Sequence, residues 1–318
     1  MIKEILPPDN PKMFNWGSGM PNNEEIPKII WLYWHSKELP DLVKMCISQF
    51  KKLLPDYTIN IVSYNTLTSF LPNISKYRED LPIANYADLI RFELLYEYGG
   101  IWVDASTLLT ENLDWAHQLK NSYHTDLIGF YSEHCTNDEN FPVLETWFLA
   151  TSPKNKFLEA WRNDFLNCYN SNTPEKYYEE IIKNPEFLQN IGSRYNYLLS
   201  YLSAMKIMRQ SSDYKILMFK GEDTAHFYNF GANLSPLEVV KLFLESPLPS
   251  KVPKLIKFEK NRRILIENRL RIGKYESDAF LLKIVNEQNP LIKKIMRKYN
   301  YITFIFNNIK NKYIHQKA

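Results

Sequence analysis

Residues 83–104 constrain the fold of this 318-residue chain more than any other segment. Apolar side chains recur in it with the 3.6-residue period of a helix, at Ile83, Ala87, Ile90, Leu94, Leu95 and Tyr98. Gly99-Gly100 ends this predicted helix, because glycine adopts a left-handed conformation at a helix C-terminus at little cost. Ile101–Val103 then predicts a short buried strand that ends on the carboxylate of Asp104. Such a junction is typical of an α/β domain.

The segments before this junction predict a parallel sheet. Ile26–Trp34 is an apolar run rich in β-branched and aromatic residues, which predicts a buried strand. Residues 40–54 have helical spacing, and Tyr57–Tyr64 predicts a second strand. A strand–helix–strand crossover of this length implies parallel pairing. Further strands are predicted at Leu127–Tyr131, Thr146–Thr151 and Tyr214–Phe219, and further helices at 155–170, 175–183, 187–209 and Pro236–Leu244.

The composition excludes several classes of protein. Hydrophobic residues make up 45% of the chain, enough to bury a core, and a net charge of +3 is too small for a typical nucleic-acid-binding protein. Cys46, Cys135 and Cys168 have neither zinc nor disulfide spacing, which favours a reducing compartment. The sequence shows no signal-peptide pattern and no apolar stretch near the ~20 residues of a membrane span. We therefore expect a cytoplasmic protein with no nucleic-acid partner.

We expect three regions along the chain. Residues 1–25, rich in Pro, Asn and Gly, predict an irregular lead-in; residues 26–250 predict the α/β domain; residues 251–318 predict a basic, mostly helical C-terminal region. Residues 291–318 carry seven Lys or Arg and no acidic residue, interleaved with apolar side chains. A cationic amphipathic segment of this kind suits an anionic membrane surface, although a helix that packs on the domain explains it nearly as well.

Asp88, Arg91 and Asp104 are the candidate catalytic residues. Asp88 and Arg91 are three positions apart and so share one helix face. They could form a surface ion pair of little energetic weight, or they could project over the strand end that holds Asp104. The direct connection through two glycines and the apolar neighbours of Arg91 favour the second interpretation. Ligands of open α/β sheets bind outside the carboxyl ends of strands, where Asp104 is expected.

The segment Asn85–Ser106 resembles the signature of the capsular polysaccharide synthesis glycosyltransferases. These are similar to the DXD-type transferases that include yeast initiating mannosyltransferases and clostridial glucosylating toxins. The shared pattern is a helix with Asp-x-x-Arg, a Gly-Gly turn and a strand that ends on aromatic-x-Asp. Ile26–Trp31 is similar to this family's first strand, and fainter similarity extends to Glu145–Phe148 and Val252–Leu255.

The resemblance implies a GT-A-like fold, in which helices flank a nucleotide-binding mixed α/β sheet. It implies transfer of a sugar from a nucleotide-sugar donor, for which we expect UDP, to a capsular or surface polysaccharide or its lipid-linked oligosaccharide precursor, with retention of anomeric configuration. On this sequence, Asp88 and Arg91 would contact the donor sugar, and Arg91 would also approach the phosphate. Trp31 would stack on or flank the base. Asp104 would lie near the ribose and a divalent cation, Mn²⁺ or Mg²⁺.

The chain departs from the DXD pattern at its second acidic position, which is Ser106. A hydroxyl is only a weak, neutral metal ligand, so Ser106 leaves the metal requirement open. Further ligands could come from a loop after a predicted strand, which holds Glu222, Asp223 and His226, although a solvated acidic loop is the plainer interpretation. Lys254 and Lys257 lie in the basic stretch 251–260, which could bind the diphosphate, and Lys254 is the candidate that we select. Lysines also protect exposed strand edges, which is the plainer interpretation.

Two other functions fit the same residues. A sugar-phosphate transferase of capsule synthesis would need a general base, for which His226 is the candidate. A non-catalytic carbohydrate-binding protein that had lost a metal site would explain Ser106.

Overall fold

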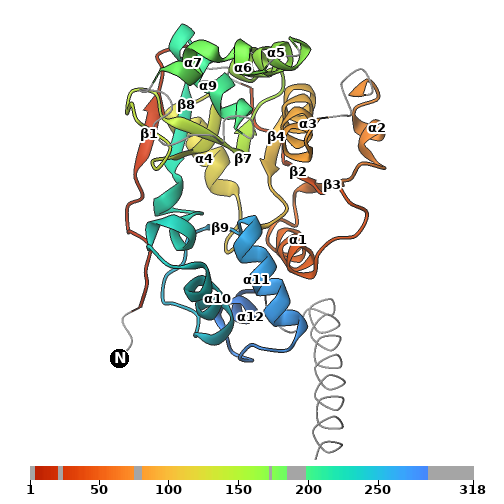
Figure 1. The fold of residues 1–318 in the computed structure, drawn as a ribbon, viewed down its shortest axis with the longest axis vertical. Coiled ribbons are helices and arrows are strands. Elements are labelled where there is room, and N and C mark those ends of the chain that lie inside the picture. The colour runs from red at the N-terminus through yellow and green to blue at the C-terminus, as the bar shows by residue number, and fades with distance from the viewer. Residues whose placement is uncertain (1–3, 21–23, 75–80, 172–173, 185–197, 286–318) are drawn as a thin grey trace, which may run out of the picture.

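The computed structural model describes residues 4–20, 24–74, 81–171, 174–184 and 198–285 (Figure 1). Its centre is a seven-stranded mixed sheet in the order β1-β8-β6-β7-β4-β2-β3, and β5 and β9 form a separate antiparallel pair. The strands are β1 (Met13–Trp16), β2 (Ile29–Tyr33), β3 (Thr58–Val62), β4 (Gly100–Val103), β5 (Thr107–Leu109), β6 (Leu127–Ser132), β7 (Val143–Thr151), β8 (Ile216–Lys220) and β9 (Leu255–Lys257).

Helices cover both faces of the sheet and form a group of their own at one end. They are α1 (Asp41–Leu53), α2 (Leu67–Phe70), α3 (Ile83–Tyr98), α4 (Asp114–Tyr123), α5 (Lys156–Asn170), α6 (Pro174–Tyr177), α7 (Glu179–Lys183), α9 (Leu199–Gln210), α10 (Pro236–Glu245), α11 (Lys260–Arg271) and α12 (Phe280–Val285). A 3₁₀ turn, η3 (Gly221–Asp223), and a π-helical turn, η4 (Phe227–Gly231), follow β8. In Figure 1, α10, α11 and α12 lie together at the lower end of the molecule.

Alternate residues of each strand enter different cores, because successive side chains of a strand point to opposite faces. In β2, Trp31 and Tyr33 join the cluster formed with α3, α5 and α9. Ile30 and Leu32 join the cluster formed with α1 and α4. A third cluster unites α10, α11 and α12 with one side of α1 and with β9. The central strands are therefore buried on both faces, which leaves the ends of the strands for ligands.

The junction between α3 and β4 requires both of its glycines. Gly99 and Gly100 have φ angles of 62° and 93°, a region that residues with a side chain rarely adopt. A Cβ on Gly100 would lie 2.6 Å from the carbonyl oxygen of Ile29, so the glycine also lets β4 approach β2 closely. This geometry fixes how the end of α3 is placed relative to the end of β4.

The expected α/β class is confirmed, and so is the parallel pairing of β2 with β3 across α1. The expectation of an irregular lead-in is wrong for Met13–Trp16, which pairs antiparallel with β8 at the edge of the sheet. Its short length hides the alternation that identifies strands. Beyond the expected boundary at residue 250, β9 returns to pair with β5.

Residues 291–318, where the basic tail was expected, lie outside the described residues. So does most of the first half of the helix predicted at 187–209. Among the described helices, none has the length and apolar character needed to cross a bilayer.

Candidate active site

The carboxyl ends of five strands meet along one edge of the sheet. β2 is parallel to β3 and β4, and β6 is parallel to β8. β7 lies between β4 and β6 and is antiparallel to both, so all five other strands of this set run in one direction. Asp104 follows the last residue of β4 at this edge, and the first residues of β7 lie at the same edge. This is the position at which open α/β sheets bind ligands.

Asp88, Arg91 and Asp104 form one ion-pair network, as the sequence predicts. Arg91 pairs through Nη1 with Asp88 and places Nη2 3.1 Å from Asp104 Oδ1. The indole N–H of Trp102 donates to the same Oδ1 at 3.1 Å. Asp88 and Arg91 are buried, whereas the side chain of Asp104 remains 31% exposed. Asp104 is therefore the member of the network that a ligand can reach.

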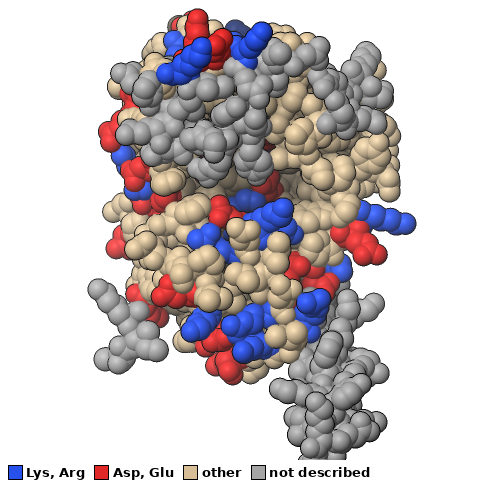
Figure 2. Space-filling view, viewed as in Figure 1, with Lys and Arg blue, Asp and Glu red and all other residues tan. Residues whose placement is uncertain are grey.

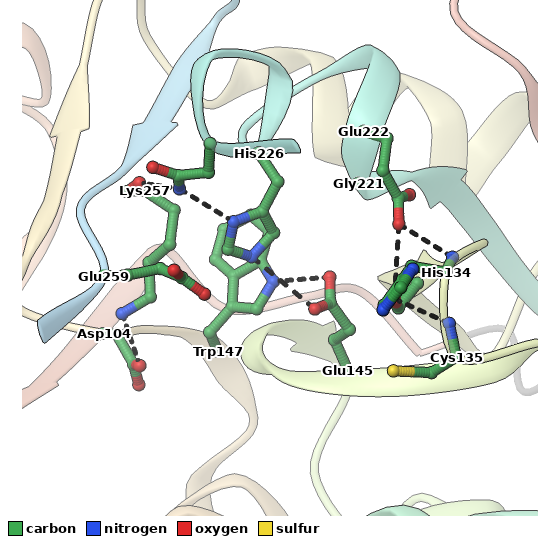
Figure 3. Close-up of polar contacts among 12 residues, drawn as sticks. Asp104, His134, Cys135, Glu145, Trp147, Gly221, Glu222, His226, Lys257 and Glu259 are labelled. Carbon is green, nitrogen blue, oxygen red and sulfur yellow. Dashed lines mark hydrogen bonds and ion pairs between the residues drawn. The ribbon is translucent and has the colours of Figure 1, made fainter. Parts of the chain in front are cut away.

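Lys257, which is 153 positions from Asp104 in the sequence, also belongs to this network. Its ammonium donates to Asp104 Oδ2 at 2.7 Å (Figure 3) and also to Ser106 Oγ at 3.0 Å. The antiparallel register of β5 and β9 sets Lys257 opposite Thr107, next to Ser106. Of the lysines in the basic stretch 251–260, Lys257 is therefore the one that lies at the site.

The structure does not bring Lys254 to this network. Its ammonium lies 2.5 Å from Glu111 Oε1, and its side chain is 57% exposed. Lys254 precedes β9 and pairs with Glu111, whereas Lys257, the last residue of β9, pairs with Asp104. Of the two lysines, Lys257 is therefore the one that contacts Asp104.

Trp31 also differs from its expected place. Its side chain is 2% exposed, its indole N–H donates to the Gly99 carbonyl at 2.9 Å, and its ring packs against Phe70 and Tyr98. A ring enclosed in this way has no open face for a base to stack on. Trp31 lies in the middle of β2, and the inward-facing position of that strand buries it.

His226 lies near the same edge, but the neighbours of its two ring nitrogens are Asn229 and Glu145. The amide nitrogen of Asn229 donates to the Lys257 carbonyl at 2.7 Å and lies 3.0 Å from His226 Nδ1. Since an amide nitrogen can only donate, Nδ1 accepts and the ring carries its proton on Nε2. Nε2 lies 3.5 Å from Glu145 Oε1. Figure 3 shows the His226 ring between Lys257 and Glu145, beside Trp147.

Glu145 is a further buried acid at this edge, one that the sequence gives little reason to select. Its Oε2 accepts from the Trp147 indole at 2.9 Å. A Cβ on Gly221 would lie 2.9 Å from the same oxygen, so the absence of a side chain there makes room for the carboxyl group. Burial raises the pKa of Glu145 to about 8, and burial lowers the pKa of His226 to about 3.

Glu222 and Asp223, the acidic residues of the predicted loop, bind the backbone of other segments. Glu222 accepts from the backbone N–H groups of Glu133 and His134, and Asp223 accepts from the backbone of Lys12. In the part of the chain that the structure describes, no group of three or more His, Cys, Asp or Glu side chains could hold a metal ion.

Electrostatics keep Asp104 ionised. Burial alone would raise the pKa of its carboxyl group, but the charges of Lys257 and Arg91 outweigh burial and lower the pKa to about 2. Figure 2 shows that the visible face of the molecule is hollowed across its middle, where acidic and basic side chains lie side by side. A polar, charged recess of this kind suits an anionic or polyhydroxylated ligand.

Known proteins resemble parts of the chain. It is 27% identical over 165 residues to the O-glycosyltransferase braB of Annulohypoxylon truncatum, covering 46% of this chain and 38% of that protein. It is 25% identical over 162 residues to the O-glycosyltransferase PaGT of Phomopsis amygdali, covering 45% and 39%. The matches thus span about two-fifths of the length of these relatives.

The apo structure of the bifunctional glycosyltransferase WbbM is similar over 87% of this chain and 52% of that one, with 13% identity and a TM-score of 0.43. The model of the capsular polysaccharide synthesis protein family matches residues 15–182, which include α3, the two glycines, β4 and β7. That match covers more than half of the 318 residues, and the chain therefore belongs to the capsular polysaccharide synthesis protein family.

Proposed function

We propose that the chain is a glycosyltransferase of GT-A-like fold that moves a sugar from a uridine-linked nucleotide sugar to a capsular or surface polysaccharide, or to its lipid-linked precursor. The observation that carries the proposal is the ionised Asp104 at the carboxyl edge, with Arg91 and Lys257 on its two oxygens. Family membership supports it, and so do the names of the two curated relatives.

The chemistry of such a transfer matches this arrangement. When the glycosidic bond to the donor breaks, negative charge grows on the departing diphosphate, and preorganised cations at that position lower the barrier. Arg91 and Lys257 are both held in place by carboxylates, so little reorganisation is needed when charge develops. Asp88 holds Arg91 in place through their ion pair. Asp104, the more exposed acid, contacts the hydroxyl groups of the donor. We propose retention of configuration, which requires no side-chain base to activate the acceptor.

The sugar-phosphate transferase alternative assigns a base to His226. That imidazole accepts from Asn229 through Nδ1 and carries its only proton toward Glu145. Neither nitrogen is left to take a proton from an acceptor, so the geometry favours glycosyl transfer.

We propose that the enzyme works at the cytoplasmic face of a membrane, where a lipid-linked acceptor would lie. The support is the charge of residues 291–318, whose seven Lys or Arg are attracted to anionic lipid.

The test is product analysis with the full chain. Purified protein is incubated with a panel of UDP-, GDP- and dTDP-sugars, first alone and then with candidate acceptors, and the products are identified by mass spectrometry. We expect release of UDP with one sugar of the panel, and Asp104→Asn serves as the inactive control. A phosphodiester-linked product would replace the proposal with sugar-phosphate transfer. Binding of glycan without turnover of any donor would replace it with a carbohydrate-binding function.

A further inference from the structure

The ammonium of Lys257 occupies the place where the DXD pattern predicts a metal ion. It lies 2.7 Å from Asp104 Oδ2 and 3.0 Å from Ser106 Oγ, and the DXD pattern would assign these two side chains to the cation. The Lys257 side chain is only 12% exposed, and the pairing of β9 with β5 holds its backbone opposite Thr107. The contact is therefore built into the sheet and does not depend on a flexible surface chain.

The donor atoms around this point do not fit a divalent cation. Both oxygens of Asp104 are engaged, Oδ1 by Arg91 and Trp102 and Oδ2 by Lys257. Ser106 offers one neutral hydroxyl, whereas Mg²⁺ and Ca²⁺ require six or more oxygen ligands, with carboxylates among them. His226, the remaining candidate, accepts from Asn229 through Nδ1 and directs its protonated Nε2 to Glu145.

Charge balance around Lys257 accounts for the departure from DXD at Ser106. One carboxylate, Asp104, balances one ammonium, and a second carboxylate at position 106 would call for a second positive charge. An ammonium has three N–H donors. Asp104 and Ser106 accept two of them, and the third has no partner among the described residues. That third donor is available to a phosphate oxygen.

We propose that Lys257 supplies the positive charge for the donor diphosphate at the Asp104–Ser106 position, so that this chain binds a nucleoside diphosphate without a divalent cation. The proposal rests on the glycosyl-transfer function proposed above. It assigns Lys257 as a substrate-binding residue and Ser106 as the residue that orients its ammonium.

The experiment measures UDP binding to the full chain by calorimetry, once in EDTA and once in Mn²⁺. We expect the two dissociation constants to agree within about threefold, and Lys257→Met to weaken UDP binding about tenfold or more in both buffers. Lys257→Arg, which keeps a donor and a positive charge, should retain most of the affinity in EDTA. Lys251→Met is the matched control, because it also removes an ammonium that pairs with an aspartate, here Asp9, at an exposed position. Tightening of wild-type binding by Mn²⁺ of tenfold or more would overturn the proposal.

A second measurement separates this proposal from the proposed function and covers a variant that fails to fold. Electron paramagnetic resonance reports Mn²⁺ binding to the chain without any nucleotide. We expect no stoichiometric site in the wild type and a gain of Mn²⁺ binding in Lys257→Asp, which sets two carboxylates side by side. A stoichiometric wild-type site that Asp104→Asn abolishes would refute the role of Lys257. If UDP did not bind in either buffer, glycosyl transfer from UDP-sugars would fail, and the Mn²⁺ measurement would still decide which cation the site holds.

Discussion

The guanidinium carbon of Arg91 lies 4.7 Å from the centre of the Trp102 ring. Arg91 comes from α3 and Trp102 from β4, so this cation–π contact bridges the Gly99–Gly100 junction. The same two side chains converge on Oδ1 of Asp104. The position of the exposed carboxylate is thereby set by a helix and a strand together, which supports it rigidly.

Arg91→Lys is expected to reduce sugar transfer by about tenfold or more, because an ammonium cannot pair with Asp88, reach Asp104 and stack on Trp102 at once. Steady-state kinetics of UDP release check this. Arg162→Lys is the matched control: Arg162 lies 4.1 Å from the centre of the Tyr96 ring and pairs with Glu93, but it lies away from the carboxyl edge. Full activity of Arg91→Lys alongside an inactive Asp88→Ala would show that the two residues do not act as a pair.

Asp104→Asn is expected to lower turnover by about a hundredfold or more while the protein stays folded. The amide keeps the shape of the carboxyl group but has one acceptor oxygen in place of two. The remaining oxygen can accept either from Arg91 and Trp102 or from Lys257. The NH₂ group then faces the other cation and repels it. Turnover is measured together with the near-ultraviolet circular dichroism spectrum. Near-normal turnover in a folded variant would remove Asp104 from the mechanism.

The sequence predicts the part of the site that is local. Asp88, Arg91 and Asp104 lie within a helix, a glycine turn and a strand, so period and turn chemistry place them. The sequence presents Lys257 only as one lysine of a basic stretch. Its contact with Asp104 cannot be predicted, because β5 and β9 are three residues each and their pairing joins positions far apart in the chain. Glu145 escapes for another reason: β7 is buried along its whole length, and nothing local separates a functional acid from a structural one.

Trp31→Phe tests whether Trp31 contacts the nucleotide or only packs in the core. The structure predicts a loss of about 1–3 kcal/mol of unfolding free energy, because the indole hydrogen bond to Gly99 and some packing volume are lost. The dissociation constant for UDP should change little. Denaturant unfolding and calorimetry measure the two quantities separately. A large loss of UDP affinity at unchanged stability would restore the expected contact with the base.

Residues 291–318 are expected to bring the protein to anionic membranes. Each basic residue near such a surface contributes on the order of 1 kcal/mol, and salt screens the attraction. The full chain should sediment with vesicles that contain phosphatidylglycerol at low salt and less so at high salt. A chain ending at Pro290 should sediment less, yet still turn over donor with a soluble acceptor. Equal sedimentation with neutral and anionic vesicles would assign the segment to packing.

Glu145 should impose a pH dependence on stability that Glu145→Gln removes. Burial raises the pKa of Glu145 from 4.5 to about 8, so between these values the native protein holds a proton that the unfolded chain has released, and the unfolding free energy falls as the pH rises. Burial lowers the pKa of His226 from 6.5 to about 3, which has the opposite effect below pH 6.5. The two effects oppose each other between pH 4.5 and 6.5, and Glu145 acts alone from pH 6.5 to 8. Over that interval wild-type stability should fall by about 1–2 kcal/mol relative to Glu145→Gln, as measured by urea unfolding. A constant difference between the two proteins from pH 6.5 to 8 would mean that the buried carboxyl group is already ionised, stabilised by the indole N–H of Trp147.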